Sequence, residues 1–206
     1  MNKMASDNAT RLEDLWAGDF GNAYNQRNSN PSERRQDFWH ALLKEFPVSN
    51  LLEIGCNVGG NLQWMHPALP WNRVYGIDIN LDALATIHER HPALNAIHAS
   101  AQNLPFRDAF FDLVFTAGVL IHQPEESLPK VMSEMVRCSK KYVLCMEYFA
   151  KETEEVPYHN QQGALFRRNY GKLFTDAFPT LSIIKEGYLS PEEGWDRITW
   201  WLMEKK

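Results

Sequence analysis

Cysteine is scarce in this sequence, with three residues among 206. Cys56, Cys138 and Cys145 are odd in number and lack a CxxC spacing, so the sequence indicates neither a disulfide framework nor a zinc site. A reducing compartment suits such free thiols best. Because the acids also form no cluster with the spacing of metal ligands, we expect no bound metal ion.

Long apolar runs are missing as well. No stretch approaches the ~20 apolar residues that span a bilayer. The first residues, MNKMASDNATRLEDLW, lack the apolar core of a signal peptide. We therefore expect a cytoplasmic protein that makes no membrane contact.

An excess of basic residues is absent too, since 21 Lys and Arg stand against 26 Asp and Glu, for a formal net charge of -5. This balance argues against nucleic acid as a partner, although it leaves room for a local basic groove. The length suits one domain with a full core. The sequence gives no indication of the oligomeric state.

The chain does contain the pattern of a nucleotide-binding half-unit. LLEIGCNVGGN joins an apolar run to a glycine turn, and VYGIDIN ends a second apolar run in Asp78. Glycine lets the backbone approach a ligand closely, and a helix after the turn offers unpaired N–H groups. An aspartate at the tip of the second strand can accept two hydrogen bonds from ribose hydroxyls. The pattern predicts a nucleotide cofactor at this point.

The glycine turn favours one class of cofactor over another. The dinucleotide fingerprint is G-x-G-x-x-G, but Asn57 replaces its middle glycine, the one that lets backbone touch a pyrophosphate. S-adenosylmethionine has no phosphate and tolerates a side chain there. Glu53, two residues before Gly55, could face the ammonium group of that cofactor, directly or through water.

Apolar periodicity predicts strands and helices in alternation. The expected elements are a helix over 33–46, a strand over 50–54, a helix over 59–66, a strand over 73–78, a helix over 81–90 capped by Asn80, a strand over 94–98, a buried strand within 110–120, a helix over 126–138 and a strand over 142–146. A loop over 151–163, a helix over 164–178 and two terminal strands, plausibly an antiparallel pair, complete the chain. This order is typical of a doubly wound α/β sandwich with one reversed strand.

The first 32 residues form a segment of their own, ahead of a main domain over 33–206. Trp16, Phe20 and Tyr24 are spaced four apart in a stretch rich in Gly and Asn. The segment is either a loose arm or short helix whose aromatics pack on the domain, or a lid over a binding site. Near the other terminus, Trp201 is either buried under a helix or exposed as a contact surface.

Four ordered motifs, LEIGCNVG, GIDIN, NLPF and FFDLVF, give residues 35–150 a resemblance to class I S-adenosylmethionine-dependent methyltransferases. The resemblance implies a Rossmann-like seven-stranded sheet, S-adenosylmethionine as cofactor and S-adenosylhomocysteine as product. It implies that Gly55 and Gly59 frame the methionine moiety, that Asp78 holds the ribose, and that Ser100 and Ala101 border the adenine. The same cofactor site would include Glu53, Cys56, Asn57, Ile79 and Ala117.

Position 100 departs from that group, in which an aspartate often bonds the adenine amino group. Ser100 is shorter and neutral, so the sequence leaves this contact open.

Further segments, RLEDLWAGDFGNAYNQRN, GVLIHQP, LFRRNY and ITWWLMEK, resemble the methyltransferases associated with pseudaminic acid biosynthesis. That resemblance implies a small polar acceptor, a sugar or nucleotide sugar of surface glycan synthesis. It also implies that an aromatic of the N-terminal segment, Tyr24, covers the cofactor. The chain departs from the group's pattern over 158–163, so the acceptor-facing loop could serve a different substrate.

Candidate catalytic residues follow the fourth and fifth expected strands. His122 is the first candidate for a general base, because its ordinary pKa of ~6.5 suits proton removal near neutrality; it could instead pack in its loop. Glu147 and Tyr148, at the end of the fifth expected strand, are expected to point into the acceptor pocket, where Glu147 could pair with a substrate amine and Tyr148 could stack or donate a hydrogen bond. Both could equally be structural.

Candidate substrate-binding residues are the basic groups nearest the 158–163 loop, His159, Arg167 and Arg168. Arginine binds carboxylate or phosphate bidentately, but two adjacent arginines on a helix are also often solvated.

Three other functions stay open. The acceptor could be tRNA or protein, the chain could be a non-catalytic cofactor-binding partner subunit, or it could be an NAD-dependent oxidoreductase. Asn57 counts against the last, as does the lack of a Tyr-x-x-x-Lys pair.

Overall fold

A computed structural model describes residues 3–206, with side chains from residue 8 onwards. Its centre is a seven-stranded sheet with the strand order β3-β2-β1-β4-β5-β9-β8. The strands are β1 (Leu51–Ile54), β2 (Val74–Asp78), β3 (Asn95–His98), β4 (Phe111–Ala117), β5 (Ser139–Glu147), β8 (Leu181–Leu189) and β9 (Ile198–Lys205). Strands β1 to β5 pair in parallel, and β9 runs antiparallel to both β5 and β8. The expected doubly wound fold with one reversed strand is confirmed.

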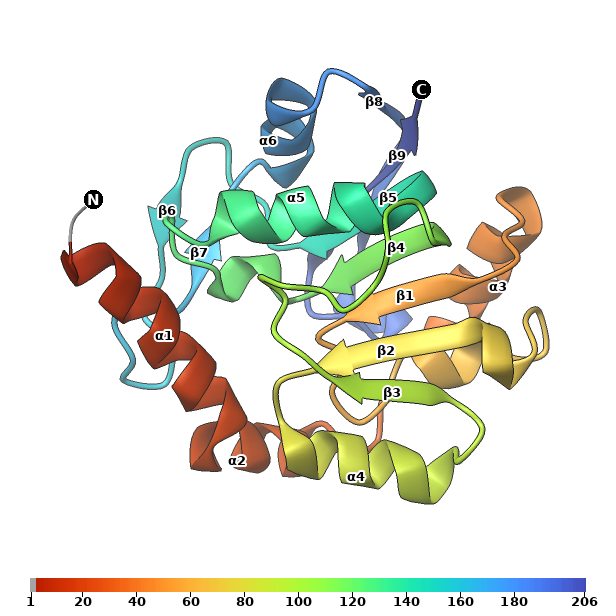
Figure 1. Cartoon of the computed structure of the whole chain (residues 1–206), viewed down its shortest axis with the longest axis horizontal. Coiled ribbons are helices and arrows are strands. Elements are labelled where there is room, and N and C mark those ends of the chain that lie inside the picture. The colour runs from red at the N-terminus through yellow and green to blue at the C-terminus, as the bar shows by residue number, and fades with distance from the viewer. Residues whose placement is uncertain (1–2) are drawn as a thin grey trace.

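Helices cover both faces of this sheet, as Figure 1 shows. One core cluster joins the sheet to α3 (Arg35–Glu45), η1 (Leu62–Met65) and α4 (Leu81–Arg90). The opposite cluster joins it to α5 (Leu128–Cys138) and α6 (Tyr170–Ala177). Short 3-10 turns η2 (Trp71–Arg73), η3 (Leu120–His122) and η4 (Pro191–Glu193) lie in the connections. Because apolar side chains reach both faces, β1 is buried along its whole length.

Asn80 begins α4 as the sequence predicts. Its side-chain oxygen accepts a hydrogen bond from the Ala83 N–H at 2.9 Å, which satisfies one of the orphan donors of the first helical turn. The cap also fixes the loop that follows Asp78.

Two segments differ from the sequence prediction. The expected helix over 59–66 is a turn followed by the 3-10 helix η1, since Gly59 has a φ of 78°, outside the α-helical region, and Pro67 lacks the N–H with which an α-helix would continue. The expected loop over 151–163 and helix over 164–178 contain the two-stranded ribbon of β6 (Glu154–Glu155) and β7 (Phe166–Arg167) before α6. The Asn169 side chain caps α6 through the Lys172 N–H, which makes the helix begin at residue 170.

The N-terminal segment forms two helices, α1 (Lys3–Ala17) and α2 (Asp19–Arg27). Figure 1 shows α1 crossing the edge of the sheet to which the arrowheads of β1 to β4 point. Asn80 Nδ2 donates to the Trp16 carbonyl at 3.0 Å and to Asn22 Oδ1 at 2.7 Å, and Asn25 Nδ2 donates to Asn80 Oδ1 at 2.8 Å. The segment is therefore packed on the domain at the carboxyl ends of the strands.

Trp200 and Trp201 of β9 are both buried. Trp201 packs in the cluster that holds Tyr170 and Phe174 of α6, and Trp200 packs on the other face of the sheet. Of the two alternatives for Trp201, burial under a helix is confirmed. No helix among the described residues is long and apolar enough to cross a bilayer.

Candidate functional site

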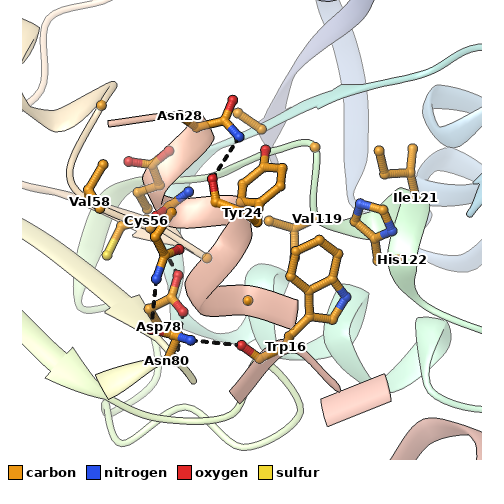
Figure 2. Close-up of a pocket in the computed structure, with 18 of the residues that line it drawn as sticks. Trp16, Tyr24, Asn28, Cys56, Val58, Asp78, Asn80, Val119, Ile121 and His122 are labelled. Carbon is orange, nitrogen blue, oxygen red and sulfur yellow. Dashed lines mark hydrogen bonds between the residues drawn. The ribbon is translucent and has the colours of Figure 1, made fainter. Parts of the chain in front are cut away.

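A cavity of about 430 Å³ opens at the carboxyl edge of the parallel strands. Its walls come from the N-terminal helices, from the loops after β1, β2, β3 and β4, and from the segment that enters β9. The predicted cofactor residues in its lining are Tyr24, Glu53, Gly55, Cys56, Asn57, Asp78, Ile79, Ala101 and Ala117. Figure 2 shows Asp78 and Cys56 on one side of this cavity and Trp16 and His122 on the other.

The glycine turn after β1 forms the floor of this cavity. Gly55, Asn57 and Gly59 have φ angles of 70°, 47° and 78°, a region that glycine enters freely and asparagine tolerates. A Cβ on Gly55 would lie 2.5 Å from a Val119 methyl, so only glycine lets the β1 and β4 loops approach this closely. Gly59 shapes the turn without lining the cavity.

Asp78 is the acid at the tip of β2. Its Oδ2 accepts a hydrogen bond from the Asn57 N–H at 2.7 Å, and its Oδ1 accepts one from the Asn80 N–H at 2.8 Å. Burial raises the pKa of this carboxyl above its ordinary value. Each oxygen retains a further lone pair, so the oriented carboxyl can still accept from a pair of neighbouring hydroxyls.

Glu53 is fully buried at the end of β1. Its Oε1 accepts a hydrogen bond from Asn61 Nδ2 at 2.6 Å, whereas its Oε2 has no donor among the described residues. Burial raises the pKa of Glu53 to about 8. The Oδ1 atoms of Asn57 and Asn61 are also buried without a donor in the described part of the chain. This end of the cavity offers acceptors that a cationic group would satisfy.

The loop after β3 contributes Ala101 to the cavity wall but not Ser100. The Ser100 hydroxyl donates a hydrogen bond to Glu13 of α1, which does line the cavity. Gln102 Nε2 donates to the same carboxylate at 3.0 Å.

His122 lies at the opposite end, in η3 after β4. Its Nδ1 is 2.5 Å from the Ala164 carbonyl; because a carbonyl only accepts, Nδ1 carries the proton and Nε2 is an acceptor. The imidazole ring centroid lies 4.6 Å from that of Trp16 and 5.0 Å from that of Tyr158. Burial lowers the pKa of His122 to about 4, so the ring is neutral at physiological pH.

Tyr148 lines the cavity, but its neighbour Glu147 does not. Glu147 is fully buried, and its carboxylate accepts hydrogen bonds from the N–H groups of Val119, Leu120 and Ile121 at 3.2, 3.0 and 3.2 Å. Burial raises its pKa to about 7. The expectation that Glu147 points into an acceptor pocket is wrong, because this side chain instead clamps the loop that carries His122.

The expected substrate-binding basic residues also lie away from the cavity lining. His159 and Arg167 are exposed. Arg168 is 4% exposed, donates to the Gln123 carbonyl at 3.0 Å and lies over the Phe166 ring. Arg168 is thus neither solvated nor free for an acceptor, because its guanidinium ties the segment before α6 to the loop after β4.

Several residues of the cavity wall were not assigned to the site from the sequence. They are Glu13, Arg35, Asn61, Tyr158, Trp195 and Asp196, and Trp16 was noted only as an aromatic of the N-terminal segment. The Arg35 guanidinium lies 4.6 Å from the Trp195 ring centroid, and its Nε donates to the Gly194 carbonyl at 2.8 Å. The aromatic spacing of the N-terminal segment was the one signal for Trp16. Among the described residues, no group of three or more His, Cys, Asp or Glu side chains could hold a metal ion.

Comparison with known proteins gives a family for the central segment. Residues 51–142 match the family described as a methyltransferase domain. A phthiotriol/phenolphthiotriol dimycocerosates methyltransferase of Mycobacterium leprae is 27% identical over 111 residues, 52% of this chain and 40% of that protein. The chain therefore matches less than half the length of this curated relative.

Solved structures share the fold over almost the whole chain. The 1,6-didemethyltoxoflavin-N1-methyltransferase of Burkholderia thailandensis, with bound S-adenosylhomocysteine, has a TM-score of 0.76 at 13% identity, covering 98% of this chain and 90% of that one. Magnesium protoporphyrin IX methyltransferase from Synechocystis, also with S-adenosylhomocysteine bound, has a TM-score of 0.71 at 14% identity, covering 96% and 99%.

Proposed function

We propose that this chain, which has the class I S-adenosylmethionine-dependent methyltransferase fold and a methyltransferase domain on residues 51–142, transfers a methyl group from S-adenosylmethionine to a small polar acceptor. The bound cofactor supplies an activated methyl group on a sulfonium. The protein then contributes alignment and a suitable electrostatic field.

One observation carries the cofactor assignment. Glu53 Oε2 and the Oδ1 atoms of Asn57 and Asn61 are buried without donors among the described residues. Buried acceptors of this kind are costly unless a ligand pairs with them. An ammonium group has three N–H donors and a positive charge, so the methionine end of S-adenosylmethionine fits this place. Asp78 then faces the ribose hydroxyls, and Tyr24 covers the site from α2.

The acceptor side offers a neutral imidazole and aromatic walls. His122 Nε2 has no hydrogen-bond partner among the described residues, while Nδ1 is fixed on the Ala164 carbonyl. We therefore assign to Nε2 the role of taking a proton from a hydroxyl or amine acceptor as its oxygen or nitrogen is methylated. Trp16, Tyr148 and Tyr158 form the surrounding wall.

We propose a sugar or nucleotide sugar as the acceptor. The support is the resemblance to the pseudaminic acid-associated methyltransferases, together with aromatic rings that suit the faces of a sugar ring. Phthiotriol dimycocerosates, 1,6-didemethyltoxoflavin and magnesium protoporphyrin IX are the compounds named for related proteins, so the fold leaves the acceptor open.

The function can be tested with S-adenosylmethionine that carries a labelled methyl group. Purified protein is incubated with sugars, nucleotide sugars, tRNA and protein extract in parallel, and the label is followed. We expect transfer to the sugar fraction. Transfer to tRNA or protein alone would contradict the proposed acceptor class, and cofactor binding without transfer to any fraction would favour a non-catalytic binding subunit.

The Asp78→Ala variant tests the cofactor site by binding. It removes the acceptor pair assigned to the ribose, and we expect S-adenosylhomocysteine binding to weaken by ~1–3 kcal/mol. Unchanged affinity in titration calorimetry would remove the ribose assignment.

A further inference from the structure

Helix α1 brings a carboxylate to the loop after β3. Glu13 Oε1 accepts hydrogen bonds from the Ser100 hydroxyl and from Gln102 Nε2, the latter at 3.0 Å. The Gln102 N–H donates in turn to Ser100 Oγ at 3.1 Å. This network fixes Glu13 against the loop, although the residues lie 87 and 89 positions apart in the chain.

Glu13 also belongs to the wall of the cavity. The same wall includes three apolar residues close in sequence to Glu13, to Asp78 and to Ser100, namely Leu12, Ile79 and Ala101. Asp78 ends β2, and Ser100 and Ala101 follow β3, the neighbour of β2 in the sheet. A base attached to a ribose at Asp78 would lie between these side chains.

Only one of the two Glu13 oxygens is engaged. Oε1 takes both hydrogen bonds, whereas Oε2 has no donor among the described residues. The Ser100 hydroxyl donates its hydrogen to Glu13. It also carries no charge with which it could attract the amino group of a base. Among the described residues of this part of the cavity wall, the carboxylate therefore comes from α1 and not from the β3 loop.

We propose that Glu13 is the residue that selects adenine, by accepting a hydrogen bond from the exocyclic amino group through Oε2. This assignment rests on the proposed function, because it needs the cofactor's ribose at Asp78. A carboxylate accepts but cannot donate when ionised. A base with an amino group at this position is therefore favoured, and a base with a carbonyl oxygen there is repelled.

The position of Glu13 gives α1 a part in cofactor selection. The helix is held at its carboxyl end by the Asn80–Trp16 hydrogen bond. Arg11 further binds α1 to the 158–163 loop through the Gln162 carbonyl at 2.8 Å. The adenine-reading carboxylate is thus in place only when α1 is docked between the cofactor and the acceptor loop.

The test is titration calorimetry with two ligands that differ at one position, S-adenosylhomocysteine and S-inosylhomocysteine, whose base carries oxygen instead of the amino group. We expect the wild type to prefer the adenine ligand by roughly 10- to 100-fold, the range for one hydrogen bond to a charged group. Glu13→Gln should reduce that preference by about tenfold or more, because an amide can present either its oxygen or its NH₂ group.

Two further variants distinguish recognition of the adenine base by Glu13 from a role of Glu13 that only attaches α1 to the domain. Asp14→Asn removes the same charge from an exposed position of α1 and should leave the preference unchanged. Ser100→Asp in the Glu13→Gln background returns a carboxylate to the loop and should restore the preference.

Two outcomes would overturn the assignment. If Glu13→Gln weakens both ligands equally and keeps their ratio, Glu13 only tethers α1, and the proposed function stands without it. If wild-type protein binds neither ligand, the proposed function falls and the assignment falls with it.

Discussion

Glu53 Oε2 is a buried carboxylate oxygen with no donor among the described residues. Because burial raises the pKa of Glu53 to about 8, this carboxyl is mostly protonated at pH 7 when no ligand is bound. An ammonium group at Oε2 would favour the ionised form. We therefore predict that S-adenosylhomocysteine binding at pH 7 releases close to one proton.

Calorimetry in buffers of different ionisation enthalpy measures this release. The apparent binding enthalpy should vary linearly with the buffer's ionisation enthalpy for the wild type and stay constant for Glu53→Gln, which also binds more weakly. A wild-type proton count near zero would contradict the assignment of Glu53 to the ammonium.

The raised pKa of Glu53 also affects the stability of the protein without ligand. The unfolded carboxyl loses its proton near its ordinary pKa of 4.5, whereas the folded one keeps it up to about 8. The contribution of Glu53 to the free energy of unfolding is therefore fully present below pH 4.5 and is lost as the pH rises from 4.5 to about 8.

His122 shows the opposite dependence. Its folded pKa of about 4 lies below the ordinary 6.5, so between these values the unfolded chain takes up a proton that the folded protein does not. The free energy of unfolding then falls as the pH drops, by about 2 kcal/mol from this residue at pH 5. Urea unfolding at pH 7 and pH 5 should show that His122→Asn loses less stability than the wild type, and equal losses would refute this.

The role of His122 as a base is a separate prediction. His122→Asn should lower turnover and leave S-adenosylhomocysteine affinity nearly unchanged, since we assign Nε2 to the acceptor and not to the cofactor. We also expect the wild-type rate to show no His122 inflection near pH 6.5, because the neutral ring persists down to about pH 4. A variant with an unchanged rate would show that His122 only orients its neighbours.

At the scale of elements, one residue of the domain, Asn80, bonds both α1 and α2. Asn80 caps α4 and at the same time bonds Trp16, Asn22 and Asn25 of the N-terminal helices. The loop that orients Asp78 is therefore also the attachment point of the two helices, which links the ribose position to the cover of the site.

Gly21→Ala tests this attachment. A Cβ on Gly21 would lie 1.9 Å from the Trp16 carbonyl and 2.8 Å from Asn80 Nδ2, so α2 must move away from α1 and from the Asn80 side chain that holds both helices. Hydrogen exchange should become faster over 8–27 while β1, β4 and β5 stay protected, and S-adenosylhomocysteine should bind more weakly. Ala23→Ser, at an exposed position of α2, is the control. Unchanged exchange over 8–27 in Gly21→Ala would contradict the attachment.

The sequence predicted the elements whose signals are local. The Gly55 turn, the acid at Asp78 and the Asn80 cap each follow from the conformation or hydrogen bonding of one residue, and all are where they were expected. Glu147 and Arg168 were misjudged because a strand-end acid or a basic residue near a helix start gives no sign of burial. Their partners are backbone groups of the β4 loop, and only the tertiary fold brings these together.

For the molecule as a whole, the sheet gathers residues from distant parts of the chain at one edge. Glu13, Glu53, Asp78 and His122 come from four different elements or loops and line one cavity. The alternation of strands and helices along the chain was readable from the apolar pattern, whereas the contribution of α1 was not, because it depends on how the N-terminal helices cross that edge.

The central claim is that this cavity binds S-adenosylmethionine and not a dinucleotide. Titration calorimetry of the purified protein with S-adenosylhomocysteine, beside NAD under identical conditions, tests it most directly. We expect S-adenosylhomocysteine to bind with a dissociation constant on the order of micromolar, and NAD not to bind, since Asn57 stands where a pyrophosphate needs glycine. Binding of NAD without S-adenosylhomocysteine would contradict the account.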